Sequence, residues 1–193
     1  MPVRLNATAR REQLVDVAVG IFARHGYHAT SMNDIAVAAG VTKPVLYQHF
    51  PSKKDLYLAL LDEVGQRMLT RISKATAEAL DGRSQTLAGF TAYFHWVADD
   101  HDAFRLLFGS GPRSDDEFAD AVRGVSAEVA AAIATLITVD ISAEHRDTLA
   151  HAIVGMAEAA SRKLIDSGTS FDPDQLGEQL AVLAWSGLRG LGR

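Results

Sequence analysis

The side chains best suited to chemistry gather in a short stretch near the N-terminus. Within residues 42–54 the cationic and hydrogen-bonding side chains are Thr42, Lys43, Tyr47, Gln48, His49, Ser52, Lys53 and Lys54. Ammonium groups bind phosphates, and polar side chains at helical spacing can reach base edges in a DNA groove. The chemistry that this stretch indicates is therefore recognition of a nucleic acid.

Patterns typical of enzymes are missing from the sequence. There is no cysteine, which excludes disulfides, thiolate metal sites and a cysteine nucleophile. Ser126, Ser142, Ser161 and Ser186 lack a nucleophile-elbow context, and neither a Gly-rich phosphate loop nor a His-Glu-x-x-His run occurs. We expect a protein that is not an enzyme and has no cofactor.

One spacing could hold a metal ion. His95, Asp99 and Asp102 lie at i, i+4 and i+7, which would place three ligands on one helix face. The alternative is a charged helix end that runs into a loop. We favour the alternative and predict no metal site, because no cysteine or further paired histidine supports one.

The charge is divided unevenly along the chain. The net charge is −5, but residues 1–54 carry seven Lys or Arg against three acids, a balance of +4. Residues 55–193 carry twelve bases against 21 acids, a balance of −9. This division suggests a basic end for a polyanion and an acidic body. No apolar run approaches the roughly 20 residues of a membrane span, and the N-terminus lacks a signal peptide's apolar core, so we expect a cytoplasmic protein with no membrane partner.

Apolar periodicity predicts helices almost everywhere, and no segment shows sustained period-two alternation. The fold class predicted is therefore all-α. The helices are expected at residues 8–25, 32–39, 43–49, 53–80, 85–99, 103–108, 116–138, 143–167 and 174–191. Gly26 is expected to end the first of them.

The second and third of these helices form the element around which the chain is organised. Ser31 and Asp34 have the spacing of a capping box, and Gly40 is placed to make the turn between the helices. Thr42 is expected to cap the third helix through the Val45 N–H, because the intervening proline has no N–H. Two short helices joined by a tight turn are typical of a helix-turn-helix.

Lysines at two helix starts strengthen this interpretation. Lys43 and Lys53 fall in the first turns of their helices, where a cation opposes the helix dipole by roughly 0.3–1 kcal/mol. A bound phosphate would reverse that effect, because free N–H groups, dipole and ammonium then converge on one anion.

The run TSMNDIAVAAGVTKPVLYQHFPSKKDLYLALL, residues 30–61, resembles the signature of the tetracycline-repressor (TetR) family of transcriptional regulators. The Leu-Tyr-x-His-Phe run followed by Ser-Lys-Lys-Asp-Leu is its most specific part. The C-terminal LAWSGLRGLG is similar to the family's closing helix. The resemblance implies an N-terminal three-helix helix-turn-helix domain, residues 1–52, and a C-terminal helical ligand-binding and dimerisation domain, residues 53–193.

The resemblance also implies roles for individual residues. Positions that usually approach base edges are Lys43, Pro44 and Val45. Positions that usually contact phosphates are Thr30, Ser31, Thr42, Tyr47, His49 and Lys53, with Asn33 and Gln48 as additional DNA contacts. Arg4, Arg10 and Arg11 form either a basic arm or a solvated tail.

The reading helix is short, which limits what one copy can specify. Seven residues span about 10 Å at 1.5 Å per residue, enough for a few base pairs. A homodimer on a near-palindromic double-stranded DNA operator would double the contacts.

The body of the chain carries an aromatic-rich segment. The candidate lining of a pocket for an unknown small-molecule effector is Phe90, Tyr93, Phe94, Val97, Phe104 and Phe108. The alternative is that these side chains are solid core.

The last two predicted helices are rich in small residues, which suggests close packing against a second subunit. The interface candidates are Gly155, Ala159, Ala181, Ala184, Trp185 and Leu188. The alternative is burial within the monomer.

The sequence therefore predicts a DNA-binding regulator, a repressor released from a palindromic operator by a small-molecule ligand. A regulator without an inducer, and an all-α protein–protein adaptor, remain as alternatives.

Overall fold

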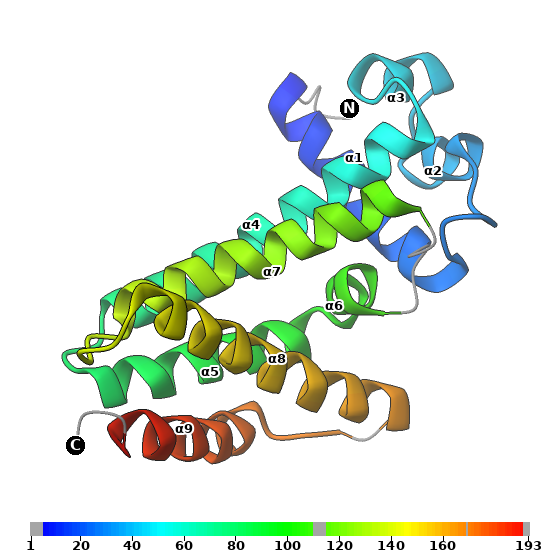
Figure 1. Cartoon of the computed structure of the whole chain (residues 1–193). Helices are drawn as coiled ribbons and strands as arrows, with labels where there is room; N and C mark the ends of the chain where they lie inside the picture. The colour runs from blue at the N-terminus through cyan, green and yellow to red at the C-terminus, as the bar shows by residue number, and fades with distance from the viewer. Residues whose placement is uncertain (1–5, 110–114, 169, 191–193) are drawn as a thin grey trace. The chain divides into compact units, whose positions relative to one another are not determined.

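A computed structural model describes residues 6–109, 115–168 and 170–190 of the chain, and within these ranges every regular element is a helix. Figure 1 shows them in order. Their bounds are α1 Ala7–His25, α2 Met32–Ala38, α3 Lys43–His49, α4 Lys53–Ala77, α5 Gly82–Asp99, α6 His101–Phe108, α7 Asp116–Leu136, α8 Ala143–Ser167 and α9 Pro173–Gly190. The all-α prediction is confirmed.

Helix ends differ from the sequence prediction mainly at the turn between α4 and α5. Residues 81–84 were expected to be a loop, but α5 begins at Gly82 because the Asp81 carboxylate accepts a hydrogen bond from the Ser84 N–H at 2.8 Å. An aspartate at this position satisfies an N–H that has no partner inside the helix.

The chain separates into two compact units, and each is built from two segments. The first comprises residues up to Val64 together with Asp102–Ala121, and the second comprises Gly65–His101 with the residues from Val122 onward. The division at residue 52 expected from the sequence does not coincide with these compact units and stays a prediction about roles.

The first unit holds α1, α2, α3, the beginning of α4, α6 and the first residues of α7. Its core contains side chains with no exposed surface from three of these helices: Leu14 of α1, Leu46 of α3 and Leu56 of α4. Helix α2 contacts both α1 and α3. Helix α2 therefore connects α3 to the longer α1.

The second unit is a bundle in which α5 is central. Helix α5 contacts α8 and α9, and α9 lies along it (Figure 1). Packing of α9 on α5 is very close at Gly177, where an added Cβ would lie 2.7 Å from the Thr91 Oγ1 and 2.9 Å from the Thr91 Cα. Only glycine permits this approach. None of the described helices combines the length and apolarity of a membrane span.

Candidate nucleic-acid interface

The start of α2 is fixed by the expected capping box. The Asp34 N–H donates to the Ser31 hydroxyl at 3.2 Å, and the Ser31 N–H donates to the Asp34 carboxylate at 2.9 Å. The hydrogen bonds from Ser31 lower the pKa of the Asp34 carboxyl. Gly40 adopts a φ of +64° in the turn that follows, a conformation that favours glycine. The capping box and the turn are both confirmed.

Helix α3 separates its residues into a buried side and an open side. Leu46 and the following Phe50 are buried, while Lys43, Pro44 and Gln48 are exposed and Val45 is half-buried. The side chain of Tyr47 is 47% exposed, so it is available to a ligand rather than buried against α1. The α3 side chains that the sequence assigned to DNA therefore lie on the open side of this helix, with Val45 and His49 half-buried among them.

The expected cap of α3 by the Thr42 side chain is wrong. The Val45 N–H donates instead to the Thr42 main-chain carbonyl at 3.0 Å, and the hydroxyl makes no capping bond. A tight i to i+3 bond of this kind satisfies the first free N–H of a helix without a side chain. The exposed Thr42 hydroxyl consequently has no role in the helix cap.

Lys53 has a structural role that the sequence did not reveal. Its Nζ donates to the carbonyl oxygens of Tyr27 and Thr30, both at 2.9 Å, and lies 4.4 Å from the centre of the Tyr27 ring. These contacts tie the start of α4 to the α1–α2 loop. Since an ammonium group has three N–H donors, one remains for a phosphate.

Thr30 is an unsuitable phosphate contact in this arrangement. Its side chain is buried and its hydroxyl donates to the Gly26 carbonyl at 2.8 Å. Gly26 has a φ of +78°, and the loop leaves α1 there. Thr30 therefore helps to shape the loop, whereas Ser31 and Asn33 are exposed at the start of α2.

An aromatic cluster that the sequence analysis missed supports the same loop. Rings from α1, the loop, α4 and α7 lie 4.8–6.0 Å apart between centroids. The cluster consists of Phe22, Tyr27, Tyr57 and Phe118. Edge-to-face pairs of this kind add to the stabilisation from burial. No local sequence pattern could reveal it, because Phe118 is distant in the chain from the other three.

Lys54 joins α4 to the beginning of α7. Its Nζ lies 2.6 Å from a Glu117 carboxylate oxygen and 3.6 Å from an Asp115 oxygen. The hydrogen bond with Glu117 raises the pKa of Lys54. The two adjacent lysines thus have different partners: Lys53 holds backbone carbonyls, whereas Lys54 is paired with acids.

Two of the three arginines weighed as a basic arm or a solvated tail belong to a helix instead. Arg10 and Arg11 both lie within α1, and Arg4 lies outside the described residues. Arg11 approaches Glu63 at 3.4 Å and stacks its guanidinium 5.4 Å from the Phe50 ring centre. Its charge and planar group bind the first unit's own residues.

The candidate effector residues divide between the two units. Phe90, Tyr93, Phe94 and Val97 lie on α5 in the second unit and are buried, with the Phe90 and Phe94 rings stacked at 6.3 Å. Phe104 and Phe108 lie on α6 in the first unit, where they contact each other at 5.4 Å. Only the α5 group can be described as one cluster.

Two buried hydroxyl groups, one on α5 and one on α8, have no hydrogen-bond partner in the described part of the chain. The hydroxyls of Tyr93 and of Ser161, on α8, are buried, and neither forms a hydrogen bond to another described residue. A buried hydroxyl without a partner costs roughly 1–3 kcal/mol. Burial raises the pKa of the Tyr93 phenol, and a direct interaction of the phenol with the Ser161 hydroxyl, too poorly placed to be a regular hydrogen bond, opposes that rise.

The residues weighed as metal ligands have separate partners. His95 pairs with Asp174 at 2.8 Å, Asp99 pairs with Arg71 at 2.7 Å, and Asp102 approaches Arg24 at 3.4 Å. Within the described residues no group of three His, Asp or Glu side chains could hold a metal ion.

The candidate subunit-interface residues on α8 and α9 differ in exposure: some are open to solvent and others are buried. Gly155 and Ala159 are exposed, but Ala181 and Ala184 are buried within the subunit, where a partner could not reach them. Trp185 is half-buried against Gly82. Leu188 packs against the Ala130, Ile137 and Ala150 cluster. The exposed side of α9 instead carries Val182 (55% exposed) and Leu183 (63% exposed).

Comparison with known proteins gives a consistent result. The family model described as bacterial regulatory proteins, tetR family, matches residues 14–60, and the one described as tetracyclin repressor-like, C-terminal domain, matches residues 83–187. The chain is 32% identical to the HTH-type transcriptional activator FasR of Mycolicibacterium smegmatis, over 96% of this chain and 85% of FasR.

Two solved structures are similar over nearly the whole chain. A TetR-like regulator from Rhodococcus sp. RHA1 has a TM-score of 0.78 at 27% identity, covering 97% of this chain and 100% of that one. FadR from Bacillus subtilis, in complex with stearoyl-CoA, has a TM-score of 0.75 at 19% identity, covering 91% and 98%, a likeness of fold alone. With both halves matched in sequence, the chain belongs to the TetR family of DNA-binding transcriptional regulators.

Proposed function

We propose that the protein is a sequence-specific regulator that binds a palindromic operator as a homodimer and is released by a small-molecule ligand. The observation that carries the proposal is the open surface of α3, where Lys43, Pro44, Tyr47 and Gln48 are exposed above the buried Leu46. Lys43 can donate to guanine acceptors, and Pro44 and Val45 offer apolar contact to thymine methyls. Ser31, Asn33, Thr42, His49 and the third N–H of Lys53 are proposed as additional contacts, mostly to phosphates.

Selection from random duplex DNA tests this proposal. The whole protein is mixed with a randomised duplex, bound DNA is recovered, and the enriched sequences are read. We expect an inverted repeat whose half-sites each span a few base pairs, because α3 is a single short helix in each subunit. Recovery without any enriched repeat would favour the adaptor alternative, which predicts weak duplex binding without sequence preference.

Replacing Lys43 with alanine is expected to weaken binding to the selected operator by about 1–3 kcal/mol and to relax the preference at one position of each half-site. Lys43 is exposed, so this change should leave thermal stability unaltered. Fluorescence anisotropy with operator and with one-base variants measures both effects. Lys74→Ala is the matched control, because it removes the same charge from an exposed position near the end of α4.

The homodimer is proposed to form through α8 and α9. Gly155 and Gly187 are helix-interior glycines where an added Cβ would have no described atom within 4 Å. Glycine inside a helix costs roughly 0.5–1 kcal/mol relative to alanine, and close approach of a second subunit would account for it. On α9, Val182 and Leu183 also present apolar side chains to solvent.

Leu183→Glu tests this interface. We expect the dimer dissociation constant to rise at least tenfold, or about 1.4 kcal/mol, because a carboxylate would be buried at the contact. Sedimentation velocity across a dilution series measures it. Leu80→Glu is the control, since Leu80 is 98% exposed but lies in the turn after α4. Equal dimer affinity for Leu183→Glu and the unchanged protein would move the interface elsewhere.

The proposed ligand is a fatty-acyl thioester that binds in the second unit. This class is suggested by the stearoyl-CoA in the FadR structure, together with the buried aromatic rings of α5. Ligand should raise the thermal midpoint by mass action and lower operator affinity by as much as it prefers the released state. Thermal shift and anisotropy with stearoyl-CoA measure these effects. No response would favour a regulator without this class of inducer.

A further inference from the structure

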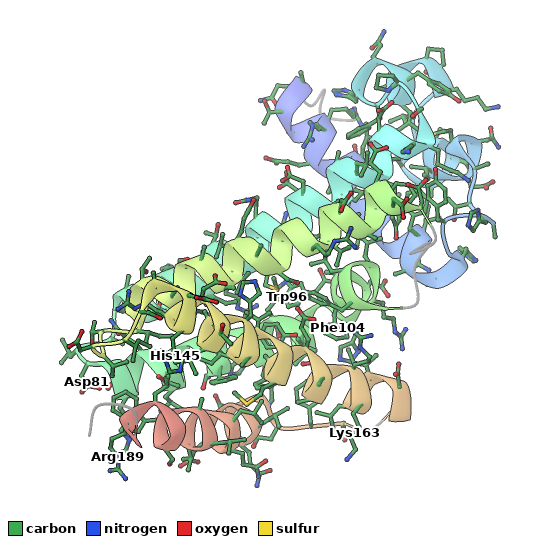
Figure 2. All side chains as sticks on the ribbon, in the orientation of Figure 1. Asp81, Trp96, Phe104, His145, Lys163 and Arg189 are labelled. Carbon is green, nitrogen blue, oxygen red and sulfur yellow. The ribbon has the colours of Figure 1, made fainter. Side chains whose placement is uncertain are left out.

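Two hydroxyl groups in the second unit are buried and have no hydrogen-bond partner among the described residues. Tyr93 is 6% exposed and Ser161 is fully buried, and neither hydroxyl bonds to a described residue. They come from different helices, α5 and α8, which contact each other. Figure 2 labels two residues near them in the sequence, Trp96 on α5 and Lys163 on α8. Buried polar groups are nearly always hydrogen-bonded, so two unpartnered hydroxyls close together require an explanation.

The surroundings of the Tyr93 hydroxyl restrict what could bind there. The Tyr93 ring contacts Phe94 at 5.3 Å in an edge-to-face arrangement and Trp96 at 5.9 Å. An acidic side chain, Glu158, and a basic one, Arg162, both lie near enough to act on the phenol. Apolar rings with two neutral O–H donors suit a neutral oxygen acceptor, because burying a neutral carbonyl costs far less than burying a carboxylate.

We propose that the Tyr93 and Ser161 hydroxyls form the polar end of a ligand site in the second unit, and that both donate to a neutral carbonyl oxygen of an otherwise apolar ligand. The inference rests on the proposed function, because it assigns recognition residues for the effector. A thioester carbonyl has the required chemistry: it carries no charge and offers two acceptor lone pairs. The hydroxyls thereby select for the carbonyl, and the aromatic rings select for the apolar chain.

The first test uses the ligand-free protein. Tyr93→Phe and Ser161→Ala are each expected to leave the thermal midpoint unchanged or raise it, because removing an unpartnered buried hydroxyl loses no hydrogen bond. Ser126→Ala is the matched control. The Ser126 hydroxyl donates to Glu158 at 2.9 Å, so its removal should lower the midpoint. A lowered midpoint for both Tyr93→Phe and Ser161→Ala would mean that the two hydroxyls bond to each other, and would overturn the proposal.

The second test measures recognition of the carbonyl. Stearoyl-CoA is compared with S-octadecyl-CoA, the thioether that has the same chain without the carbonyl, by isothermal titration calorimetry. For the unchanged protein we expect the thioester to bind about tenfold more tightly, or about 1.4 kcal/mol. In Tyr93→Phe combined with Ser161→Ala the two ligands should bind with equal affinity. Ser126→Ala should keep the tenfold preference.

The outcomes separate this inference from the proposed function. If the unchanged protein binds both ligands equally and either one releases the operator, the hydroxyl assignment is overturned and the proposed function stands. If operator binding is sequence-specific but neither ligand binds, the acyl-thioester class fails, and the carbonyl contact fails with it. If no operator is recovered, the proposed function itself fails, whatever the calorimetry gives.

Discussion

Lys53→Met is expected to lower the free energy of unfolding by about 2–3 kcal/mol and to weaken binding to every DNA sequence. The change leaves the carbonyls of Tyr27 and Thr30 without their donor, and hydrogen bonds to charged groups contribute roughly 1.5–3 kcal/mol. The loop before α2 would lose its hydrogen bonds to α4 but keep the contact between the Tyr27 and Tyr57 rings. Urea denaturation measures the stability, and anisotropy against operator and random duplex measures the binding.

Lys43→Met is the control for this experiment. It removes an equivalent charge from an exposed site, so stability should stay within about 0.5 kcal/mol. The salt dependence of DNA binding separates the two roles of Lys53: a slope smaller by about one indicates that its third N–H also contacts a phosphate. An unchanged urea midpoint would show that the carbonyl contacts do not hold the loop.

Gly177→Val is expected to destabilise the protein by about 3 kcal/mol. The new Cβ would lie 2.7 Å from the Thr91 Oγ1 and 2.9 Å from its Cα, and the Cα belongs to the rigid backbone of α5. Overpacking of a close helix contact costs roughly 1–3 kcal/mol, and valine's branched methyls place this change at the upper end. Differential scanning calorimetry measures the effect.

Gly124→Val is the matched control, because it makes the same substitution inside α7. An added Cβ at Gly124 meets no described atom within 4 Å, so helix propensity alone should change stability by a few tenths of a kcal/mol. Similar midpoints for the two variants would mean that α9 can move away from α5 without loss.

The fold class and the exposed side of α3 could be predicted because both depend on local patterns. Each of the features that could be predicted involves residues only a few positions apart in the chain. They are the capping box of Ser31 and Asp34, the turn at Gly40, and the placing of Leu46 among exposed polar residues. Local spacing determines which face of a helix is apolar. It therefore identified which side chains of α3 are open.

The remainder depends on contacts between distant residues. Lys53 reads as a phosphate ligand in the sequence, but its carbonyl partners lie more than twenty residues earlier. The small residues of α9 suggested a subunit interface, but their presence in the sequence does not tell which side of the helix faces the core. Ala181 and Ala184 turned out to face the core, while Val182 and Leu183 face solvent, because the packing of α9 on α5 determines its orientation. Composition alone carries no information about that orientation.

The contacts of Lys54 and Phe118 limit how this protein could be recombined with its relatives. A chimera that exchanged only residues 1–64 would import Tyr27, Tyr57 and Lys54 but leave behind the Phe118 ring and the acids that they contact. To exchange DNA specificity, a chimera should therefore transfer residues 102–121 together with the N-terminal segment. We expect the proposed operator preference to be transferable only with both segments of the first unit.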